Sequence, residues 1–472
     1  TGVNYVLNNM GRAMKAGFSA VKITPDFSTQ LGGAGTGEKR YATSILDDIF
    51  ARAMVIESEG KKICFLSLDV TIVTEDYTKK IRKFAQSLGF LPESVMVSAV
   101  QNHSAPSLGN FMLDPDFPQL PERFEYVRGG ETKTFQFIFE KVCQAVRAAN
   151  ENLVPVVPCA GRAVFDGLAF NRRAVTRSGK VRMPWFYPKV QKPLGPVDIK
   201  YIEGPIDPEI GVMCFQLENM RFHCGILHFT CHPVNVFATD YYAISSDWPG
   251  AWVAELEKFF EAGCLVANGC CGNVNPWPAF QPDFYPDHRK MGKQLAEITE
   301  KIVTRLTVSN SENIAFKSKI IEIPFRIEPD ITEKAKKFLE ENPLPAIMKD
   351  HSERIAPEWF EAASIMSVEY ARKRGNFLYE IQAFRIGDFA LLGLPGEPFV
   401  EGQLEIKTLS PFEFTFIAHA TNHYVGYIPT SQALKRGGHE SKFGYWSKLV
   451  PEALEIIVQQ SIFLLNELYQ GD

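Results

Sequence analysis

Residues 62–70 (KICFLSLDV), 71–93 (TIVTEDYTKKIRKFAQSLGFLPE) and 94–99 (SVMVSA) decide the fold class. The first and last segments are rich in β-forming residues and predict two strands, while Thr74 precedes an amphipathic run that predicts a helix up to Gly89. Strand, helix and strand at this spacing form a βαβ unit. Residues 100–106 then leave the carboxyl end of a strand, where α/β sheets usually bind their ligands.

The same alternation extends in both directions from this unit. Residues 49–57 predict a strand that forms a hairpin with residues 62–70 across Glu59-Gly60. Further strands are expected at 17–23, 225–236, 264–268 and 412–418, with two more in 379–394 that turn at Gly387-Asp388; helices are expected at 135–150, 291–305 and, with Asp247 as N-cap, through Phe260. Residues 179–207 and 276–287 read as loops, and 328–374 as a mostly helical insertion. The sequence therefore predicts an α/β fold with mixed β-sheets and flanking helices, in one large domain over residues 16–472 after an N-terminal extension over residues 1–15.

The composition indicates a folded protein and argues against some classes of partner. The 472 residues are 45% hydrophobic and 22% charged, which is typical of a folded chain, and the net charge of −5 without a dense basic run argues against a nucleic acid partner. The most apolar C-terminal stretch, 454–469, is interrupted by polar residues, so we expect no transmembrane segment. Nine cysteines without a C-x-x-C pair are expected to be mostly buried thiols. The sequence starts at Thr1 without Met and without a leader, so the sequence leaves localisation open: we expect a secreted or periplasmic protein if a leader has been removed, and a cytoplasmic one otherwise.

Polar residues with useful chemistry follow five of the predicted strands. They are Gln101 and His103, His232, Asn273 and Asn275, Glu397, and the group His423, Tyr424 and Tyr427. A catalytic zinc ion takes about three nitrogen or oxygen ligands and keeps one position open for water. Spacing alone does not establish such a site, because a single histidine in a chain with nine is more often a structural residue than a ligand.

Several motifs, in order along the chain, resemble the N-terminal part of the neutral, non-lysosomal ceramidases and their shorter bacterial relatives. The motifs are AGFSAVKITP (16–25), LGGAG (31–35), LDDIFARAMV (46–55), SAVQNHSAP (98–106), Phe170 to Arg172, HFTCHPVNV (228–236), ISSDWPG (244–250), LPGE (394–397) and NHYVGYIPT (422–430). The match spans most of residues 16–445, and the order of the motifs is more specific than any one of them.

The resemblance implies a zinc ion, or another divalent metal, held by His232, Glu397 and Tyr427. The fourth ligand in that family is the first histidine of a His-Thr-His-Ser-Gly-Pro motif, and here Gln101 stands at that position. An amide oxygen is a weaker zinc ligand than imidazole, so metal affinity should fall or preference should shift towards harder ions. His103 matches the second histidine of the motif, and His103 and Arg172 are expected to face the developing oxyanion. Asp247, Asn273, Asn275 and Tyr424 are expected to support the ligands.

Two other positions depart from the family. Its Gly-Asp-Val-Ser-Pro turn reads Gly272-Asn273-Val274-Asn275-Pro276 here, so no serine nucleophile is available at 275. At the position of an active-site tyrosine of the family, this chain has His439. This imidazole could donate a hydrogen bond to the substrate or become a metal ligand, and His228 and His423 are further candidate ligands. The alternative is that His439 is only structural and the metal site is degraded.

The resemblance implies a metal-dependent hydrolase that cleaves an N-acyl amide, a small molecule or a lipid such as ceramide, with metal-bound water. The competing hypothesis is a non-catalytic relative that binds a lipid-like or glycan ligand in the same cleft. The long ceramidases carry a C-terminal immunoglobulin-like domain, for which we expect no room after the last helix here, so a more soluble N-acyl substrate also deserves a test.

Overall fold

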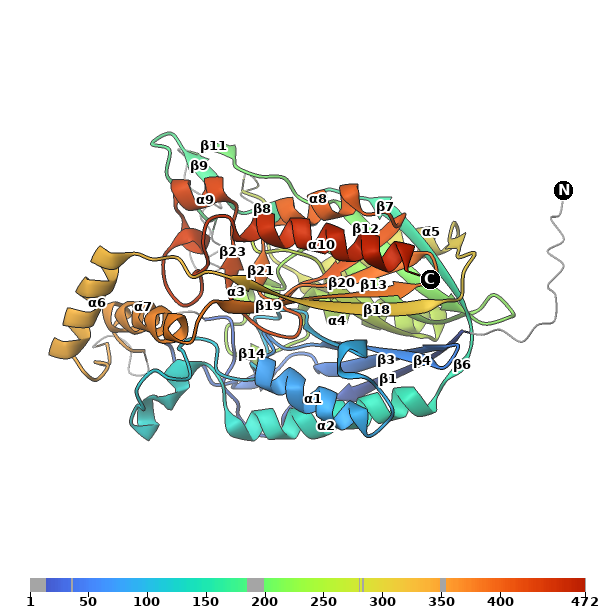
Figure 1. Ribbon diagram of the computed structural model, residues 1–472, viewed down its shortest axis with the longest axis horizontal. Helices are drawn as coiled ribbons and strands as arrows, with labels where there is room; N and C mark the ends of the chain where they lie inside the picture. The colour runs from blue at the N-terminus through green and yellow to red at the C-terminus, as the bar shows by residue number, and fades with distance from the viewer. Residues whose placement is uncertain are drawn as a thin grey trace.

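Three β-sheets pack around one central core, with helices on their outer faces (Figure 1). The computed structural model describes residues 14–34, 37–184, 199–279, 281, 284–348 and 354–471. The first sheet has the order β5 (Val95–Ala99), β4 (Lys61–Leu68), β3 (Phe50–Ser58), β1 (Lys15–Lys22) and β6 (Val154–Pro155). The second has the order β15 (Gly263–Asn268), β13 (Phe222–Phe229), β12 (Glu209–Gln216), β7 (Val157–Val164) and β17 (Thr307–Val308). The third has the order β18 (Ile314–Ile323), β19 (Phe377–Ile386), β20 (Phe389–Gly393) and β22 (Phe414–Ala418).

The inner faces of the three sheets meet in a single hydrophobic cluster. It contains Phe65 from the first sheet, Phe215 from the second and Phe384 and Phe416 from the third, and each of these rings is buried. Strands covered on both faces are hydrophobic along their whole length, which explains the continuous apolar runs in this sequence.

Helices cover the outer face of each sheet. Figure 1 shows α1 (Glu75–Gln86) and α2 (Thr132–Glu151) along one side of the molecule, against the first sheet, and α8 (Val400–Leu409) and α10 (Ala453–Gln470) along the opposite side, against the third. Helices α4 (Asp247–Phe260) and α5 (His288–Val303) cover the second sheet. The remaining helices are α3 (Asn235–Thr239), α6 (Pro329–Glu341), α7 (Pro357–Lys373) and α9 (Ser431–Arg436), with 3₁₀ turns η1 (Pro92–Ser94), η2 (Glu122–Arg128) and η3 (His439–Ser441).

Each sheet contains one parallel pair of strands, and these pairs position the strand-exit loops. The pairs are β4 with β5, β13 with β15, and β20 with β22. Short ladders tie the loops together beyond the sheets: β8 (Phe170–Asn171) pairs with β16 (Val274–Asn275), and β21 (Glu397–Pro398) pairs with β23 (Tyr427–Ile428). Two further small sheets are β2 (Ser44–Ile45) with β14 (Ala243–Ile244), and β10 (Val181–Arg182), β9 (Ala174–Thr176) and β11 (Ile199–Ile202).

The α/β fold class with mixed sheets and flanking helices is confirmed, and so are several of its predicted parts. The predicted βαβ unit is β4, α1 and β5, with parallel strands, and the hairpin of β3 and β4 turns at Glu59-Gly60. The two strands predicted in 379–394 are β19 and β20, joined at the predicted turn. All nine cysteines are free thiols, and eight of them are buried.

Two element predictions are wrong in detail. The strand predicted over 225–236 ends at Phe229, and the chain forms a loop and then α3, because Pro233 has no N–H for a strand ladder. The N-cap of α4 is Ser246 rather than Asp247, whose carboxylate instead accepts the backbone N–H groups of Val236 and Trp248.

The structure also contains strands that the sequence did not predict, and some predicted segments lie outside the described residues. Strands β7, β12 and β18 were missed, and the predicted loop 179–207 contains β10 and β11, with residues 185–198 outside the described residues. The predicted N-terminal extension also lies outside them, apart from Met14 and Lys15, and the predicted loop 276–287 is described except for 280, 282 and 283. The predicted insertion over 328–374 contains α6 and α7.

Because Leu391 lies in the central core and Leu409 does not, replacing them with alanine should have very different effects on the free energy of unfolding. Leu391 on β20 is fully buried in the central cluster, whereas Leu409 at the end of α8 is 53% exposed. We expect Leu391→Ala to lower the free energy of unfolding by about 2–5 kcal/mol, because it leaves a cavity between the sheets. Leu409→Ala should change it by less than about 0.5 kcal/mol. Chemical denaturation measures both values, and equal losses would contradict a core shared by the three sheets.

Candidate active site

Loops from the second and third sheets bring three of the predicted ligands together. His232 lies after β13, and its Nε2 is 3.2 Å from Oε2 of Glu397. Glu397 and Tyr427 are backbone partners in the parallel ladder of β21 and β23. The N–H of Glu397 donates to the carbonyl of Gly426 at 2.8 Å, so the backbone itself holds these two residues side by side. All three side chains are buried.

Both ring nitrogens of His232 face hydrogen-bond acceptors. Nδ1 is 3.1 Å from the carbonyl oxygen of Val274, and Nε2 faces the carboxylate of Glu397. Burial and then the charge of Arg172 lower the pKa of His232, so the ring is neutral at neutral pH and carries one proton. A neutral imidazole can therefore satisfy only one of these two acceptors. A cation between Nε2 and Glu397 would satisfy the other.

Glu397 is a carboxylate held in its ionised form. Burial opposes ionisation, but hydrogen bonds from His232 and Tyr424 and the charge of Arg172 outweigh burial and lower the pKa of Glu397 to about 2. The hydroxyl of Tyr424 donates to Oε1 at 2.6 Å. Burial and then the charge of Glu397 raise the pKa of Tyr427, so this phenol is protonated at neutral pH.

Arg172 lies beside Tyr427, but its donors are engaged with protein groups. Nε donates to Oε1 of Glu440 at 2.7 Å, Nη2 to the carbonyl of Gly272 at 2.7 Å, and Nη1 to Oδ1 of Asn275 at 3.1 Å. Its guanidinium carbon lies 5.5 Å from the centre of the Tyr427 ring. These contacts favour a role in holding the loops, and they leave fewer donors for an oxyanion than the sequence suggested.

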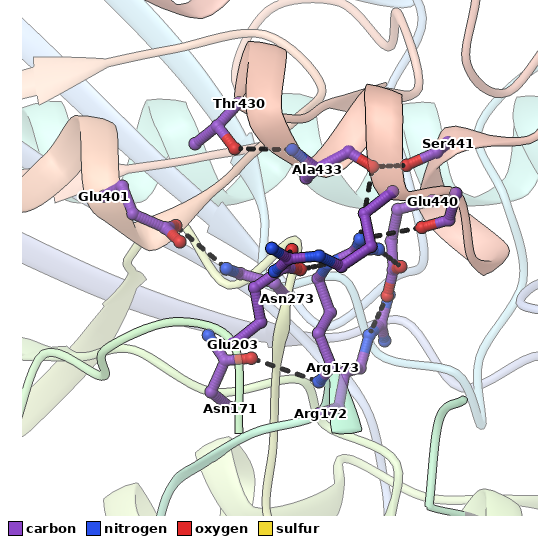
Figure 2. A network of polar contacts seen from close by, with 12 residues as sticks. Asn171, Arg172, Arg173, Glu203, Asn273, Glu401, Thr430, Ala433, Glu440 and Ser441 are labelled. Atoms are coloured by element: carbon purple, nitrogen blue, oxygen red, sulfur yellow. Dashed lines mark hydrogen bonds and ion pairs between the residues drawn. The ribbon is translucent and has the colours of Figure 1, made fainter. Parts of the chain in front are cut away.

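Figure 2 shows how Glu440 joins Arg172 to its neighbour Arg173. Nη1 of Arg173 donates to the second carboxylate oxygen of Glu440 at 2.8 Å, and Nε of Arg173 donates to Glu203. Burial opposes ionisation of Glu440. The charge of Arg172 first, and then those of His439 and Arg173, outweigh burial and lower the pKa of Glu440 to about 2. One buried carboxylate thus ties β8 and β9 to the C-terminal segment that carries His439.

Gln101 is turned towards His419 rather than towards Glu397. Oε1 of Gln101 lies 2.8 Å from Nε2 of His419, and Nδ1 of His419 lies 3.0 Å from the carbonyl of Asn268. Burial lowers the pKa of His419 to about 4, so the ring is neutral and donates from Nδ1 to the backbone. Its Nε2 then carries a lone pair that faces the amide oxygen of Gln101, and the Cys271 Sγ lies 3.6 Å from the same oxygen. Exchanging the two ends of the amide would place the NH₂ group against Nε2 and free the oxygen from His419.

Backbone strain is concentrated in the loops around these residues. Gln101 has φ +65°, Asp247 +49°, Ala420 +48° and Asn422 +61°. A left-handed backbone at a non-glycine residue costs free energy and is common where a fold holds functional side chains in place.

His103 and His439 contact different members of the ligand group. The ring of His103 is 5.5 Å from that of His232, its Nδ1 is buried without a hydrogen-bond partner, and burial lowers its pKa well below the usual range. Gly33, with φ +84°, lies so close that a Cβ there would be 2.6 Å from the His103 ring. His439 is exposed, and its ring centre is 5.6 Å from that of Tyr427. His103 is thus half-buried beside His232, and His439 is exposed beside Tyr427.

Each of the four residues predicted to support the ligands makes a hydrogen bond within this neighbourhood. Asn275 accepts from Arg172, and Tyr424 donates to Glu397, as described above. Asn273 donates to Glu401 at 2.9 Å and accepts the N–H of Val400 at 3.0 Å. Asp247 accepts the N–H of Trp248, whose indole N–H is 3.4 Å from the carbonyl of His232.

The two further histidine candidates have other surroundings. His228 stacks on Phe416 with ring centres 5.1 Å apart, inside the core between the sheets. His423 stacks on Phe377 at 5.2 Å and accepts the N–H of Glu75 at 3.3 Å. Within the described residues, no three His, Cys, Asp or Glu side chains lie together as a metal site.

Sequence reasoning missed Glu440, Arg173 and His419 as members of this neighbourhood. The pair Arg172-Arg173 was a usable signal, because two adjacent buried arginines require a buried carboxylate. His419 directly follows β22, so its position at a strand exit was a second signal.

Glu440 provides a test of the arginine network. We expect Glu440→Gln to lower the free energy of unfolding by about 3–5 kcal/mol, because two buried guanidinium groups lose their shared carboxylate. The matched control is Glu361→Gln, which breaks an exposed pair with Lys442 and should cost less than about 1 kcal/mol.

The same variant tests how the stabilisation by Glu440 depends on pH. A folded-state pKa of about 2 lies below the unfolded value of about 4.3, so the stabilisation by Glu440 is present above pH 4.3 and is lost as pH falls towards 2. The difference in stability between wild type and Glu440→Gln should shrink over that range in urea titrations. A difference that stays constant would contradict an ionised Glu440 in the native state.

Comparison with known proteins gives a consistent answer on the fold. A structure described as a ceramidase complexed with C2 superimposes with a TM-score of 0.71 and 18% sequence identity, over 97% of this chain and 76% of that chain. The neutral ceramidase from Pseudomonas aeruginosa superimposes with a TM-score of 0.70 and 17% identity, over 97% of this chain and 74% of that chain. No curated protein sequence matches significantly.

One family match concerns a short segment. The KAP family P-loop domain matches residues 292–382, less than half of the chain. That segment has only two glycines, Gly292 and Gly375, and hence no Gly-x₄-Gly-Lys phosphate-binding loop. No helix in the described part of the chain is long and apolar enough to cross a membrane. Across nearly its whole length, this chain has the fold of the neutral ceramidases, as the sequence motifs indicated.

Proposed function

We propose that this protein hydrolyses an N-acyl amide with the help of a divalent metal ion held by His232, Glu397 and Tyr427. The observation that carries the proposal is the contact of 3.2 Å between Nε2 of His232 and Oε2 of Glu397, a neutral imidazole and an ionised carboxylate. Two ligands of one divalent ion, each about 2 Å from it, can have this separation. The hydrogen bond from Nδ1 to the Val274 carbonyl is the support that metal-binding histidines usually have.

A divalent ion in this position would activate a water molecule and polarise the carbonyl of the amide. Its charge would also lower the pKa of Tyr427, which burial and Glu397 raise. Gln101 can contribute its amide oxygen as a fourth ligand once its NH₂ group pairs with His419. That oxygen is a weaker donor than imidazole, so we expect lower affinity for zinc or a preference for harder ions.

The other residues would bind and orient the substrate. His103 is neutral and has an unpartnered ring nitrogen, so it can donate a proton to, or accept one from, a group bound beside His232. His439 is exposed next to Tyr427 and can contact the part of the substrate that faces solvent. With asparagine at 275, a serine acyl-enzyme is not available there, and hydrolysis would use water directly. The structural neighbours are ceramidases, which makes a ceramide-like lipid one substrate to test.

The first test combines chelation with loss of a ligand. We expect purified protein to release fatty acid from N-acyl amides, and activity to fall at least about 100-fold after dialysis against a chelator and in His232→Ala, because each removes the Lewis acid. His228→Phe is the matched control, since this histidine stacks in the core on Phe416, and it should retain activity. Activity that survives both treatments would contradict the metal mechanism. Absence of activity on every N-acyl amide, with metal bound, would favour a ligand-binding protein.

The second test concerns the glutamine in the family's histidine position. Gln101→His restores an imidazole, and we expect it to raise zinc affinity about 10-fold or more, because imidazole is a stronger zinc donor than an amide oxygen. Competition with a coloured chelator measures the affinity without any assay of activity. Gln101→Ala is the control and should bind zinc no more tightly than wild type. Equal affinity in all three proteins would show that position 101 does not contact the metal.

A further inference from the structure

A large cavity lies next to the candidate active site. Its volume is about 1510 Å³, which exceeds the roughly 300–1,000 Å³ of a site for a small molecule. Tyr424 forms part of its wall and donates its hydroxyl hydrogen to Glu397 at 2.6 Å, so one side chain borders both the cavity and the candidate metal ligands. The cavity can therefore hold a substrate that extends well beyond the bond to be cleaved.

The wall of the cavity is polar, and its charges are nearly balanced. Its thirty-two lining residues include seven acidic and six basic ones. Several of these charges are neutralised within the protein. Arg374 pairs with Asp116 and with the buried Asp114, and Lys79 pairs with Glu75 at 2.9 Å. Such a wall has no large surplus of either charge, but it offers many hydrogen-bond donors and acceptors to a ligand.

Lys448 also contributes little net charge to this wall. It is only 3% exposed, and its Nζ donates to the carbonyl of Tyr445 at 2.9 Å and lies 3.7 Å from the centre of the Tyr445 ring. Burial lowers the pKa of Lys448 to about 7, so this amine is only partly charged at neutral pH.

Aromatic rings are the second component of the wall. Eight of the lining residues are Phe or Tyr, and six of these eight are partly exposed. The six are Tyr41, Tyr126, Phe135, Phe377, Tyr424 and Tyr445. Partly exposed rings offer flat apolar surfaces, and the tyrosines add a hydroxyl group that can donate or accept a hydrogen bond.

These two components favour one class of ligand. A long acyl chain would remove water from the charged side chains without replacing their hydrogen bonds, which is costly. An ionic ligand would find no large surplus of opposite charge. A neutral sugar chain fits both components, because a pyranose ring has apolar C–H faces that pack on aromatic rings and hydroxyl groups at its edge that donate and accept hydrogen bonds.

We propose that this cavity binds a neutral oligosaccharide, and that the amine half of the substrate is an amino sugar of that chain. The inference rests on the proposed hydrolase function for the bond that is cleaved, and on the cavity alone for the sugar. Water would add across the amide C–N bond. The acyl carbon takes the hydroxyl group and leaves as a carboxylic acid, and the nitrogen takes the remaining hydrogen and stays on the sugar as an amine.

The kinetic experiment compares a tetramer of N-acetylglucosamine with the monomer by measuring release of acetate. We expect wild type to have a KM about 10-fold lower for the tetramer, because its further rings bury apolar area in the cavity. Phe377→Leu and Tyr126→Leu should each raise the KM for the tetramer about 10-fold, because each removes a flat ring from the wall. The control is Phe463→Leu, an exposed ring on α10 that does not line the cavity, and it should change the KM by less than about 2-fold.

Calorimetry with the tetramer separates this inference from the proposed function. His232→Ala lacks a candidate metal ligand and should still bind the tetramer as wild type does, whereas Phe377→Leu should bind it about 10-fold more weakly. Binding to the cavity without hydrolysis of any N-acyl amide would support the sugar site and reject the hydrolase function. Hydrolysis of other N-acyl amides without binding of the tetramer would overturn the inference and leave the hydrolase function intact.

A charged oligosaccharide tests the selection of a neutral ligand. A tetramer of galacturonic acid has one carboxylate on each ring, and we expect it to bind wild type at least about 10-fold more weakly than the neutral tetramer, because the wall does not compensate the desolvation of four anions. Equal or tighter binding of the acid would overturn the inference.

Thermal denaturation excludes unfolded variants. Phe377→Tyr keeps the ring, so it should bind the tetramer as wild type does. If Phe377→Leu does not fold, Tyr126→Leu replaces it in both experiments with the same expected losses. Equal binding of the tetramer to wild type and to the folded leucine variants would overturn the inference.

Discussion

The contact between His232 and Glu397 is the interaction on which the account of the site depends. Both ring nitrogens of His232 face acceptors, and burial keeps the ring neutral, so one acceptor lacks a proton. Hydrogen bonds and the charge of Arg172 keep Glu397 ionised in the protein interior. Whichever of the two acceptors lacks the proton faces a lone pair of the ring. A cation between Nε2 and Glu397 would remove this conflict, and an imidazole and a carboxylate are usual ligands of a divalent ion.

The fold explains why these residues can meet although they are far apart in the sequence. Each of the three sheets supplies one parallel pair of strands, and polar residues leave the carboxyl ends of these pairs. The two-residue ladder of Glu397 with Tyr427 and the network of Arg172, Arg173 and Glu440 then fix the loops in place. Positive φ angles at Gln101 and Asn422 indicate that part of the folding free energy is used to hold this arrangement.

The sequence predicted much of this site, and its failures have clear physical causes. The strand exits before Gln101 and Glu397 follow from local hydrophobic patterns, and the structure brings Glu397 into contact with His232. The partners of Arg172 and Gln101 could not be predicted, because Glu440 and His419 are 268 and 318 residues away in the chain. The strand predicted over 225–236 was too long because the hydrophobic pattern continues past Pro233 into α3, where it serves a helix instead. The buried Lys448 carried no signal in the sequence, because its burial depends on segments distant in the chain that enclose the cavity.

The most direct measurement of the central claim is anomalous diffraction at the zinc absorption edge from crystals of this protein grown with zinc. The account predicts one strong anomalous peak between Nε2 of His232 and Glu397, within about 2.3 Å of both and of the Tyr427 hydroxyl oxygen. A fully occupied zinc peak elsewhere in the molecule, with only water between His232 and Glu397, would contradict it.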